Sequence, residues 1–262
     1  MYTDEFFKIA LYMIVGMIIC LSIVLPIIHR SRRSSHIPEY GELADNTLKF
    51  VNGTYSVILA LNSYTNYNYI TGYDCSEVYV KASKEALLKD WGIGNIEDGL
   101  TMVEELYNGL HNSMYLEEVK DRGIDLMDET EFKKYCKVYY KKSSKQKEYV
   151  HQGYRKFNEY AILGWDLGRA NMLLGDFYIS GYLTKNEYRT NVLRITNKIQ
   201  KSFHSWEEFN LSFMCGYLYW SGDDVSQPSN WKGNFQHRLY IIKKLNKAKD
   251  SPYKLPWNTP LI

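Results

Sequence analysis

Three side chains that can do chemistry together lie within one turn of a predicted helix: Trp165, Asp166 and Arg169. Asp166 and Arg169 are three positions apart and therefore neighbours on a helix, with the acid nearer the N-terminus, as the helix dipole favours. Trp165 and Arg169 are four positions apart, a spacing that lets a guanidinium stack on an indole. Such a set can fix the register of two helices, bind a ligand or take part in catalysis.

The residues that follow Arg169 are apolar on several sides of the predicted helix, so these charges are expected to be partly buried. A buried ion pair persists only when further groups complete its hydrogen bonds, and Glu187 on the next predicted helix is the expected partner. Trp206, which begins the helix after that, is the fifth candidate residue. A structural polar network is the simpler interpretation. A ligand-binding role, or a hydrolase or transferase site around Asp166, Arg169 and Glu187, is the alternative.

Other signatures of catalysis or metal binding are missing from the sequence. The six histidines are isolated, and there is no HExxH motif, P-loop or nucleophile elbow. The four cysteines form no CxxC pair and no metal-binding spacing. A net charge of +2 gives no electrostatic case for nucleic acid. We therefore expect no cofactor, no metal and no nucleic-acid partner, and an enzyme is the less favoured class.

Apolar residues recur at helical spacing through the chain after residue 41, and no run of strict alternation indicates a strand. The sequence therefore predicts an all-α, multi-helix domain over residues 41–262. Residues 62–73, which are polar and aromatic, are expected to form a loop. Helices are expected over residues 43–61, 76–91, 96–113, 150–164, 165–179, 184–203, 205–221 and 235–248, with another that starts near residue 128.

Two helix starts carry a capping box, in which a side-chain hydroxyl and a carboxylate three residues later each accept a hydrogen bond from the other's backbone N–H. The first pair is Thr184 with Glu187, and the second is Ser205 with Glu208. These pairs fix the expected starts of two helices.

Aromatic residues mark two segments that are expected to pack in the core. The last residues, 251–262, contain three prolines and cannot form a helix, so we expect them to lie extended across the helices with Trp257 as an apolar anchor. An aromatic stripe at spacings of three and four is expected to face the core; its members are Trp206, Phe209, Phe213, Tyr217 and Trp220.

Residues 9–28 form an uncharged, apolar run of twenty residues. At about 1.5 Å per residue, a helix of this length covers the ~30 Å hydrocarbon core of a bilayer. One lysine precedes the run and three arginines follow it, so the positive-inside rule places the C-terminal side in the cytoplasm. We expect a retained single-pass anchor in the inner or plasma membrane, with residues 1–8 outside, residues 29–40 as a basic linker and residues 41–262 as the cytoplasmic domain.

Four segments of the chain resemble a known family. LLKDWGI (residues 87–93), GWDLGRANMLLGDFYISGYLTKNEY (residues 164–188) and SFHSWEEFNLSFMCGYLYW (residues 202–220) are similar to the bacterial family of domains of unknown function numbered 1266. The ending SPYKLPW resembles the Ser-Pro-Trp…Pro-Trp tail of many members, with Tyr253 in place of the first tryptophan.

The resemblance covers about residues 87–257 and implies an all-helical bacterial domain without a settled activity. It adds no role for any single residue. The positions that match the family motif are Trp165, Asp166, Arg169, Gly181, Tyr182, Glu187 and Trp206.

Three functional hypotheses stay open at this point. The favoured one is a protein-interaction module held at the membrane with an unknown protein partner, and its specific version is an immunity-type protein that neutralises a toxin. The second is the hydrolase or transferase, which requires its three charged side chains to line a pocket open to solvent. The third is a sensor of lipid surfaces through the seven lysines of residues 133–147, although a solvated helical face is the simpler account of that segment.

Overall fold

The computed structural model describes residues 45–64, 66–72, 77–226, 228 and 232–262. The predicted membrane helix (residues 9–28), the segment before it (residues 1–8) and the basic linker (residues 29–40) lie outside the described residues, and these predictions stay predictions. Within the described part of the chain, no helix is both long enough and apolar enough to cross a bilayer.

The described residues form an all-helical structure without strands, as the sequence predicts. Short 3₁₀ turns lie at Ile70–Gly72, Ile124–Leu126, Lys141–Ser143, Asn158–Tyr160 and Pro252–Lys254. The α-helices are α2 (Asp45–Gly53), α3 (Ser56–Leu61), α4 (Glu77–Trp91), α5 (Ile96–Tyr107), α6 (Leu110–Asp121), α7 (Glu129–Tyr139), α8 (Ser144–Phe157), α9 (Leu163–Ile179), α10 (Lys185–Ser202), α11 (Trp206–Ser221) and α12 (Phe235–Lys247).

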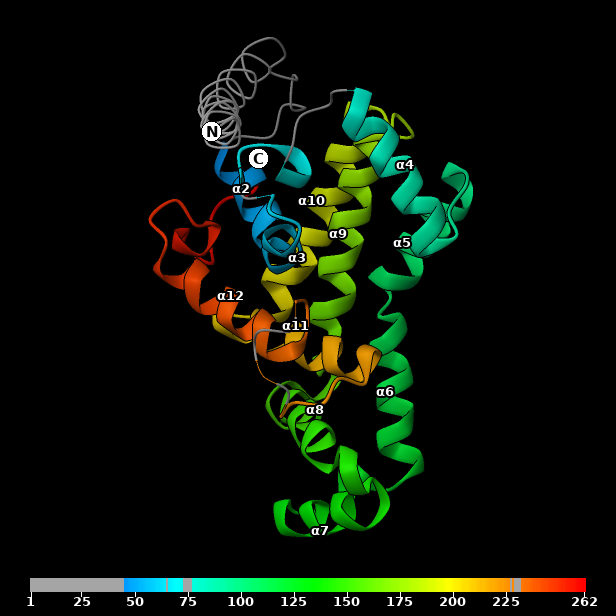
Figure 1. The fold of residues 1–262 in the computed structure, drawn as a ribbon, viewed down its shortest axis with the longest axis vertical. Coiled ribbons are helices and arrows are strands. Elements are labelled where there is room, and N and C mark those ends of the chain that lie inside the picture. Colours follow the sequence, from blue (N-terminus) through cyan, green and yellow to red (C-terminus); the bar gives the residue numbers. More distant parts are fainter. Residues whose placement is uncertain (1–44, 65, 73–76, 227, 229–231) are drawn as a thin grey trace, which may run out of the picture. The chain divides into compact units, whose positions relative to one another are not determined.

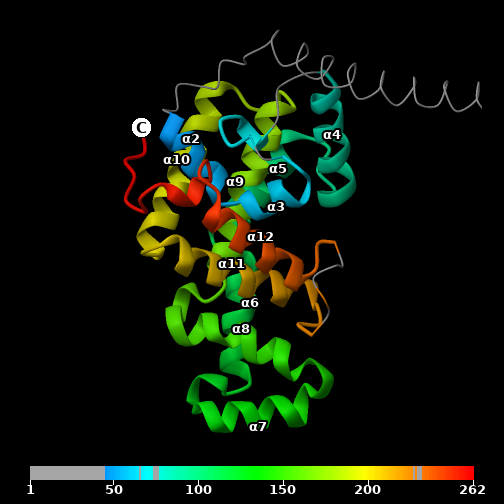
Figure 2. The same cartoon turned by 60° about the vertical axis from the view of Figure 1, so that its left-hand side comes forward.

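Helix α9 is the central element of the described domain. It packs against α4, α5, α6, α10 and α11, and Figures 1 and 2 both show it between α10 and α5. Thirteen of its seventeen residues are buried. A helix that is apolar on nearly every side is stable only inside a domain. The polar side chains of α9, Asp166 and Asn171 among them, are therefore held in the interior, where each needs hydrogen-bond partners.

Two of the expected helices are each divided into two. The helix expected over residues 43–61 is α2 followed by α3, and the one expected over residues 96–113 is α5 followed by α6. Between α5 and α6, Gly109 has a φ of +81°, a left-handed conformation that glycine adopts at little cost and that ends the helical path. Helix α8 spans Ser144–Phe157 rather than residues 150–164. It begins earlier because the lysine-rich stretch belongs partly to it, and it ends earlier because a 3₁₀ turn, Asn158–Tyr160, follows it before α9.

The two expected capping boxes have different outcomes. The Thr184 box is confirmed, because the Thr184 side chain accepts from Glu187 N–H and the Glu187 carboxylate accepts from Thr184 N–H. At the second start, Ser205 caps the Glu208 N–H as expected. The Glu208 carboxylate, however, accepts from the N–H of His204, one residue before the expected donor. Both helices nevertheless begin where the sequence places them.

The C-terminal tail packs against α2 and α11 with Trp257 as its anchor, as predicted. Its first part is not extended as expected, because Pro252–Lys254 form a 3₁₀ turn. We call Phe50, Trp206, Tyr253 and Trp257 the Trp206 cluster. Within it the ring centroids of Trp206 lie 4.5 Å from Phe50, 5.0 Å from Tyr253 and 5.1 Å from Trp257. Figures 1 and 2 show the red C-terminal segment beside α2. The C-terminal tail therefore packs against α2, the first described helix.

The lysine-rich segment is largely solvated, as its simpler interpretation predicts. Six of its seven lysines are exposed, while Lys147 pairs with Glu118 across 3.4 Å and lies over the rings of Tyr140 and Tyr219. Contact of this segment with lipid stays a prediction.

Candidate functional site

Arg169 lies among three tryptophan rings contributed by three helices. Its guanidinium carbon is 4.0 Å from the ring centroid of Trp91 in α4, 5.0 Å from that of Trp165 in α9 and 5.6 Å from that of Trp220 in α11. These distances are within the range of cation–π attraction. The predicted stacking of Arg169 on Trp165 is confirmed, and two further rings join it. We call Trp91, Trp165, Arg169 and Trp220 the Arg169 cluster.

The guanidinium of Arg169 has no anionic partner among the described residues. Its nitrogen atoms are not among the buried ones that lack a hydrogen bond, so its N–H groups reach solvent. Burial beside the rings lowers the pKa of Arg169 to about 10, and the charge of Asp166 offsets this effect only in part. The side chain is therefore a cation at neutral pH, held on aromatic faces rather than by a carboxylate.

The Arg169 cluster opens to solvent at Trp220. This ring is 55% exposed, whereas the other four members of the predicted aromatic stripe are buried as expected. Trp165 is buried, its ring centroid 5.7 Å from that of Trp220, and its Nε1–H has no hydrogen-bond acceptor within the described structure. Buried N–H groups without an acceptor are rare because they cost free energy. The cluster thus contains an unpaired cation and an unpaired donor side by side.

A close approach of α9 and α11 fixes Trp165 in this cluster. A Cβ atom at Gly216 would lie 2.2 Å from the Cβ of Trp165 and 3.0 Å from the carbonyl oxygen of Ile162. Only glycine leaves room for the two helices at this distance. The Trp165 ring also packs edge-on against Phe213, with 5.1 Å between the ring centroids. The indole is therefore positioned by rigid elements on two sides.

Asp166 is fully buried and caps α6 rather than pairing with Arg169. Its Oδ2 accepts from the backbone N–H groups of His111 at 3.0 Å and Asn112 at 2.9 Å, and its Oδ1 lies 2.6 Å from Nδ1 of His111. The first N–H groups of a helix lack intrahelical acceptors and carry partial positive charge. Because Gly109 at the N-cap of α6 has no side chain to satisfy them, the carboxylate does so. The expected Asp166–Arg169 ion pair does not form.

Glu187 and Trp206 are engaged elsewhere. Glu187 is exposed at the start of α10, where its carboxylate accepts from the N–H of Thr184 at 2.8 Å and from its hydroxyl at 2.6 Å. The expected contact of Glu187 with Asp166 and Arg169 is absent from the described structure, because the helix start already occupies this carboxylate. Trp206 belongs to the cluster under the C-terminal tail. The five candidate residues therefore form no single network.

His111 is a candidate that sequence reasoning missed. A carboxylate beside Nδ1 favours the tautomer that carries the proton there, which leaves Nε2 as an acceptor. A general base or a metal-binding histidine uses this arrangement. The imidazole is 16% exposed, and no described side chain bonds to its Nε2. The partners are 55 residues apart in the chain, so no local spacing signals the pair.

Trp91 and Trp220 were also missed as members of this site. Trp91 is the last residue of α4, and the next apolar residue, Ile93, is buried. In the sequence, Trp91 precedes two glycines and indicates packing at a helix end, and Trp220 falls at core spacing in the aromatic stripe. Neither pattern shows that both rings meet Arg169.

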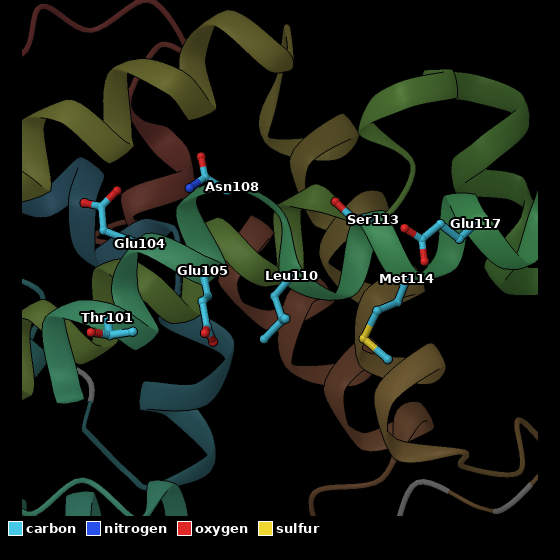
Figure 3. Close-up of a pocket in the computed structure, with 8 residues that line it drawn as sticks. All are labelled: Thr101, Glu104, Glu105, Asn108, Leu110, Ser113, Met114 and Glu117. Carbon is cyan, nitrogen blue, oxygen red and sulfur yellow. The ribbon is translucent and has the colours of Figure 1, made fainter.

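A shallow depression along α5 and α6 does not have the properties of a site (Figure 3). It is lined from α5 and the turn after it by Thr101, Glu104, Glu105 and Asn108, and from α6 by Leu110, Ser113, Met114 and Glu117. In Figure 3 these side chains point in different directions rather than toward one point. Binding sites instead converge a few polar groups on one ligand. No group of three or more His, Cys, Asp or Glu within the described part of the chain is placed to hold a metal ion.

The structure thus defines an all-helical domain with a cation held among tryptophans at its surface. Residues 86–257 match the family described as Protein of unknown function (DUF1266), and the chain belongs to this family. Comparisons with curated proteins and with solved structures gave no match. Three of the four segments that carry the resemblance meet in the Arg169 cluster, since the first contributes Trp91, the second Trp165 and Arg169, and the third Trp220.

Proposed function

We propose that this protein is a membrane-anchored binding domain that engages a protein partner through the Arg169 cluster. The observation that supports it is the half-exposed Trp220 beside a cation that has no anionic partner among the described residues. Tryptophan and arginine supply much of the binding energy at protein interfaces, since each covers a large area and donates directed hydrogen bonds. The cluster therefore has the composition of an interface centre.

Membrane attachment is the second part of the proposal and comes from the sequence. Residues 9–28 would span the bilayer, and the arginines after them would keep the helical domain in the cytoplasm. In the immunity-type version of this function, the partner is a toxin that the domain intercepts at the membrane. Alkaline carbonate washing of membranes tests the anchor: the full chain should stay in the membrane fraction, and its release would contradict this part.

Co-purification of the full chain from its host tests the binding function. Trp220→Ala removes the exposed ring of the cluster, and Tyr240→Ala on α12 is a matched control, because Tyr240 is 48% exposed and lies outside the cluster. We expect one partner in stoichiometric amount with the wild type and with Tyr240→Ala, and its loss with Trp220→Ala. Equal recovery with all three proteins would show that the partner binds elsewhere.

One observation supports the hydrolase or transferase hypothesis, the contact between Asp166 and His111. It replaces the site of Asp166, Arg169 and Glu187 that the sequence predicted. His111→Asn tests it, because the Asn amide can replace Nδ1 as donor to Asp166 but removes Nε2. A base at His111 predicts that this variant keeps its stability and loses at least about a hundredfold in rate on any substrate found in a panel of esters, phosphates and glycosides. Unchanged rates would end this hypothesis.

A further inference from the structure

The Arg169 guanidinium lies close to two aromatic rings. Its central carbon is 4.0 Å from the ring centroid of Trp91 and 5.0 Å from that of Trp165. Its N–H groups lie in the plane of the group and reach solvent. A guanidinium that is stacked on its faces presents a planar fork of donors, and this fork matches the two oxygens of a carboxylate.

The charge at this site suits a ligand group with a single negative charge. Arg169 is the one cation that contacts the rings of Trp91, Trp165 and Trp220 within the described structure. The nearby carboxylate of Asp166 is already bound by His111 and by the start of α6. A phosphate, which carries more charge, is usually held by several cations or by a helix N-terminus. One guanidinium, with no other cation on these three rings within the described structure, balances one carboxylate.

We propose that Arg169 binds the carboxylate of an acidic side chain of the protein partner, while the exposed ring of Trp220 packs on the apolar residues that flank it. This inference rests on the proposed function. The Trp165 Nε1–H is buried in the same cluster without an acceptor within the described structure. A partner that carries Asp or Glu between apolar residues therefore meets the charge, the donors and the exposed apolar surface of this site.

Fluorine NMR of the full chain in detergent micelles, labelled with 5-fluorotryptophan, tests the proposal. The chain has six tryptophans, and Trp→Phe variants assign their signals. The probes are acetyl-Leu-Glu-Leu-amide and acetyl-Leu-Gln-Leu-amide, which differ by one charge, together with sodium acetate and sodium phosphate at constant ionic strength. Signals of Trp206 and Trp257, which lie in the other cluster, report in the same spectrum whether each variant is folded.

We expect the Glu peptide to shift the Trp220 and Trp165 signals in a saturable way and to bind about tenfold or more tightly than the Gln peptide, as a charge-assisted hydrogen bond implies. Arg169→Met should abolish this preference while the signals of the Trp206 cluster stay in place. Arg169→Lys, which keeps the charge without the planar fork, should restore only part of it.

Four results would overturn the proposal. Equal binding of the two peptides would mean that the site recognises apolar surface alone, and the proposed protein-binding function would survive without the carboxylate. Acetate that binds as tightly as the Glu peptide would make a free small carboxylate the ligand. Phosphate that binds more tightly than both would replace the carboxylate with a phosphoryl group. No shift of the cluster signals with any probe would remove Arg169 as an anion site.

Discussion

The described part of the molecule contains two tryptophan clusters, and they differ in how completely their polar groups are satisfied by hydrogen bonds. In the Trp206 cluster each indole N–H has an acceptor, since Trp206 donates to the carbonyl of Leu255 at 3.0 Å and Trp257 donates to that of Phe203 at 2.7 Å. The Tyr253 hydroxyl likewise donates to Asn210 at 2.9 Å. In the Arg169 cluster the Trp165 N–H has no acceptor and the guanidinium has no anion among the described residues.

This difference separates aromatic residues that hold the fold from aromatic residues that are free to bind. Burying a ring stabilises a domain, but burying its N–H without an acceptor cancels part of the gain. In the Trp206 cluster every indole N–H and the Tyr253 hydroxyl already have an acceptor, so none of these donors is available to a ligand. The cluster around Arg169 keeps unsatisfied donors and an exposed ring, so it gains free energy when a ligand supplies acceptors and apolar surface.

The largest expected effect is a loss of stability on mutation of the Trp206 cluster. Trp206→Ala should lower the free energy of unfolding by about 4 kcal/mol, because it removes a buried ring and leaves a cavity under the tail. Urea unfolding of the full chain in micelles, followed by circular dichroism, measures this loss. A loss below about 1 kcal/mol would mean that the tail does not depend on this ring, and the contrast between the clusters would fail.

Asp166→Ala is expected to cost about 3 kcal/mol, since it leaves the first N–H groups of α6 buried without an acceptor. Asp166→Asn keeps one oxygen as an acceptor and should lose less than Asp166→Ala. The same urea titration measures both. If instead Asp166→Ala kept full stability and lost only partner binding, Asp166 would belong to the binding surface and not to the scaffold beneath it.

Burial lowers the pKa of His151 as it lowers that of Arg169, but His151 loses its charge at neutral pH whereas Arg169 keeps it. Burial, and to a lesser extent the charge of Arg155, lowers the pKa of His151 from 6.5 to about 4, so this ring is neutral where Arg169 is still charged. Because the folded state binds the proton less well than the unfolded state, stability is complete above pH 6.5 and falls as the pH drops toward 4. We expect a loss of about 2 kcal/mol between pH 7 and pH 5.

The measurement for this prediction is the urea midpoint at pH 7 and at pH 5, for the wild type and for His151→Phe. The variant keeps a ring next to Phe132, whose ring centroid is 4.0 Å from that of His151 in the wild type, and it should show a flatter pH dependence. Equal slopes for the two proteins would assign the pH dependence to other groups.

The smallest expected effect on stability is that of Trp220→Ala, at or below about 0.5 kcal/mol, because the ring is half in solvent already. Its effect on partner recovery should nevertheless be complete. A loss of stability as large as that of Trp206→Ala would make the two clusters equivalent and would remove the distinction between scaffold and site.

Local signals in the sequence were sufficient for most helices and for the contact between Arg169 and Trp165. Helices α9, α10, α11 and α12 lie close to their expected ranges, and α10 and α11 begin at capping residues that act within three positions of the chain. The stacking of Arg169 on Trp165 was predictable for the same reason, since both belong to one helix. The break at Gly109 was harder to place, because glycine is tolerated inside helices as well as between them.

The sequence by itself determined an all-helical domain of a family of unknown function, with charged and aromatic residues set into a buried helix. Only the tertiary structure decided their partners. The Asp166 carboxylate accepts hydrogen bonds from the start of α6, because the unsatisfied N–H groups of that helix lie next to it in space. The Glu187 carboxylate accepts from the N–H of Thr184, which lies at the start of its own helix. Trp91 and Trp220 reached Arg169 from helices far away in the chain. Spacing along one helix fixes neighbours within it, whereas contacts between helices depend on packing that no local pattern encodes.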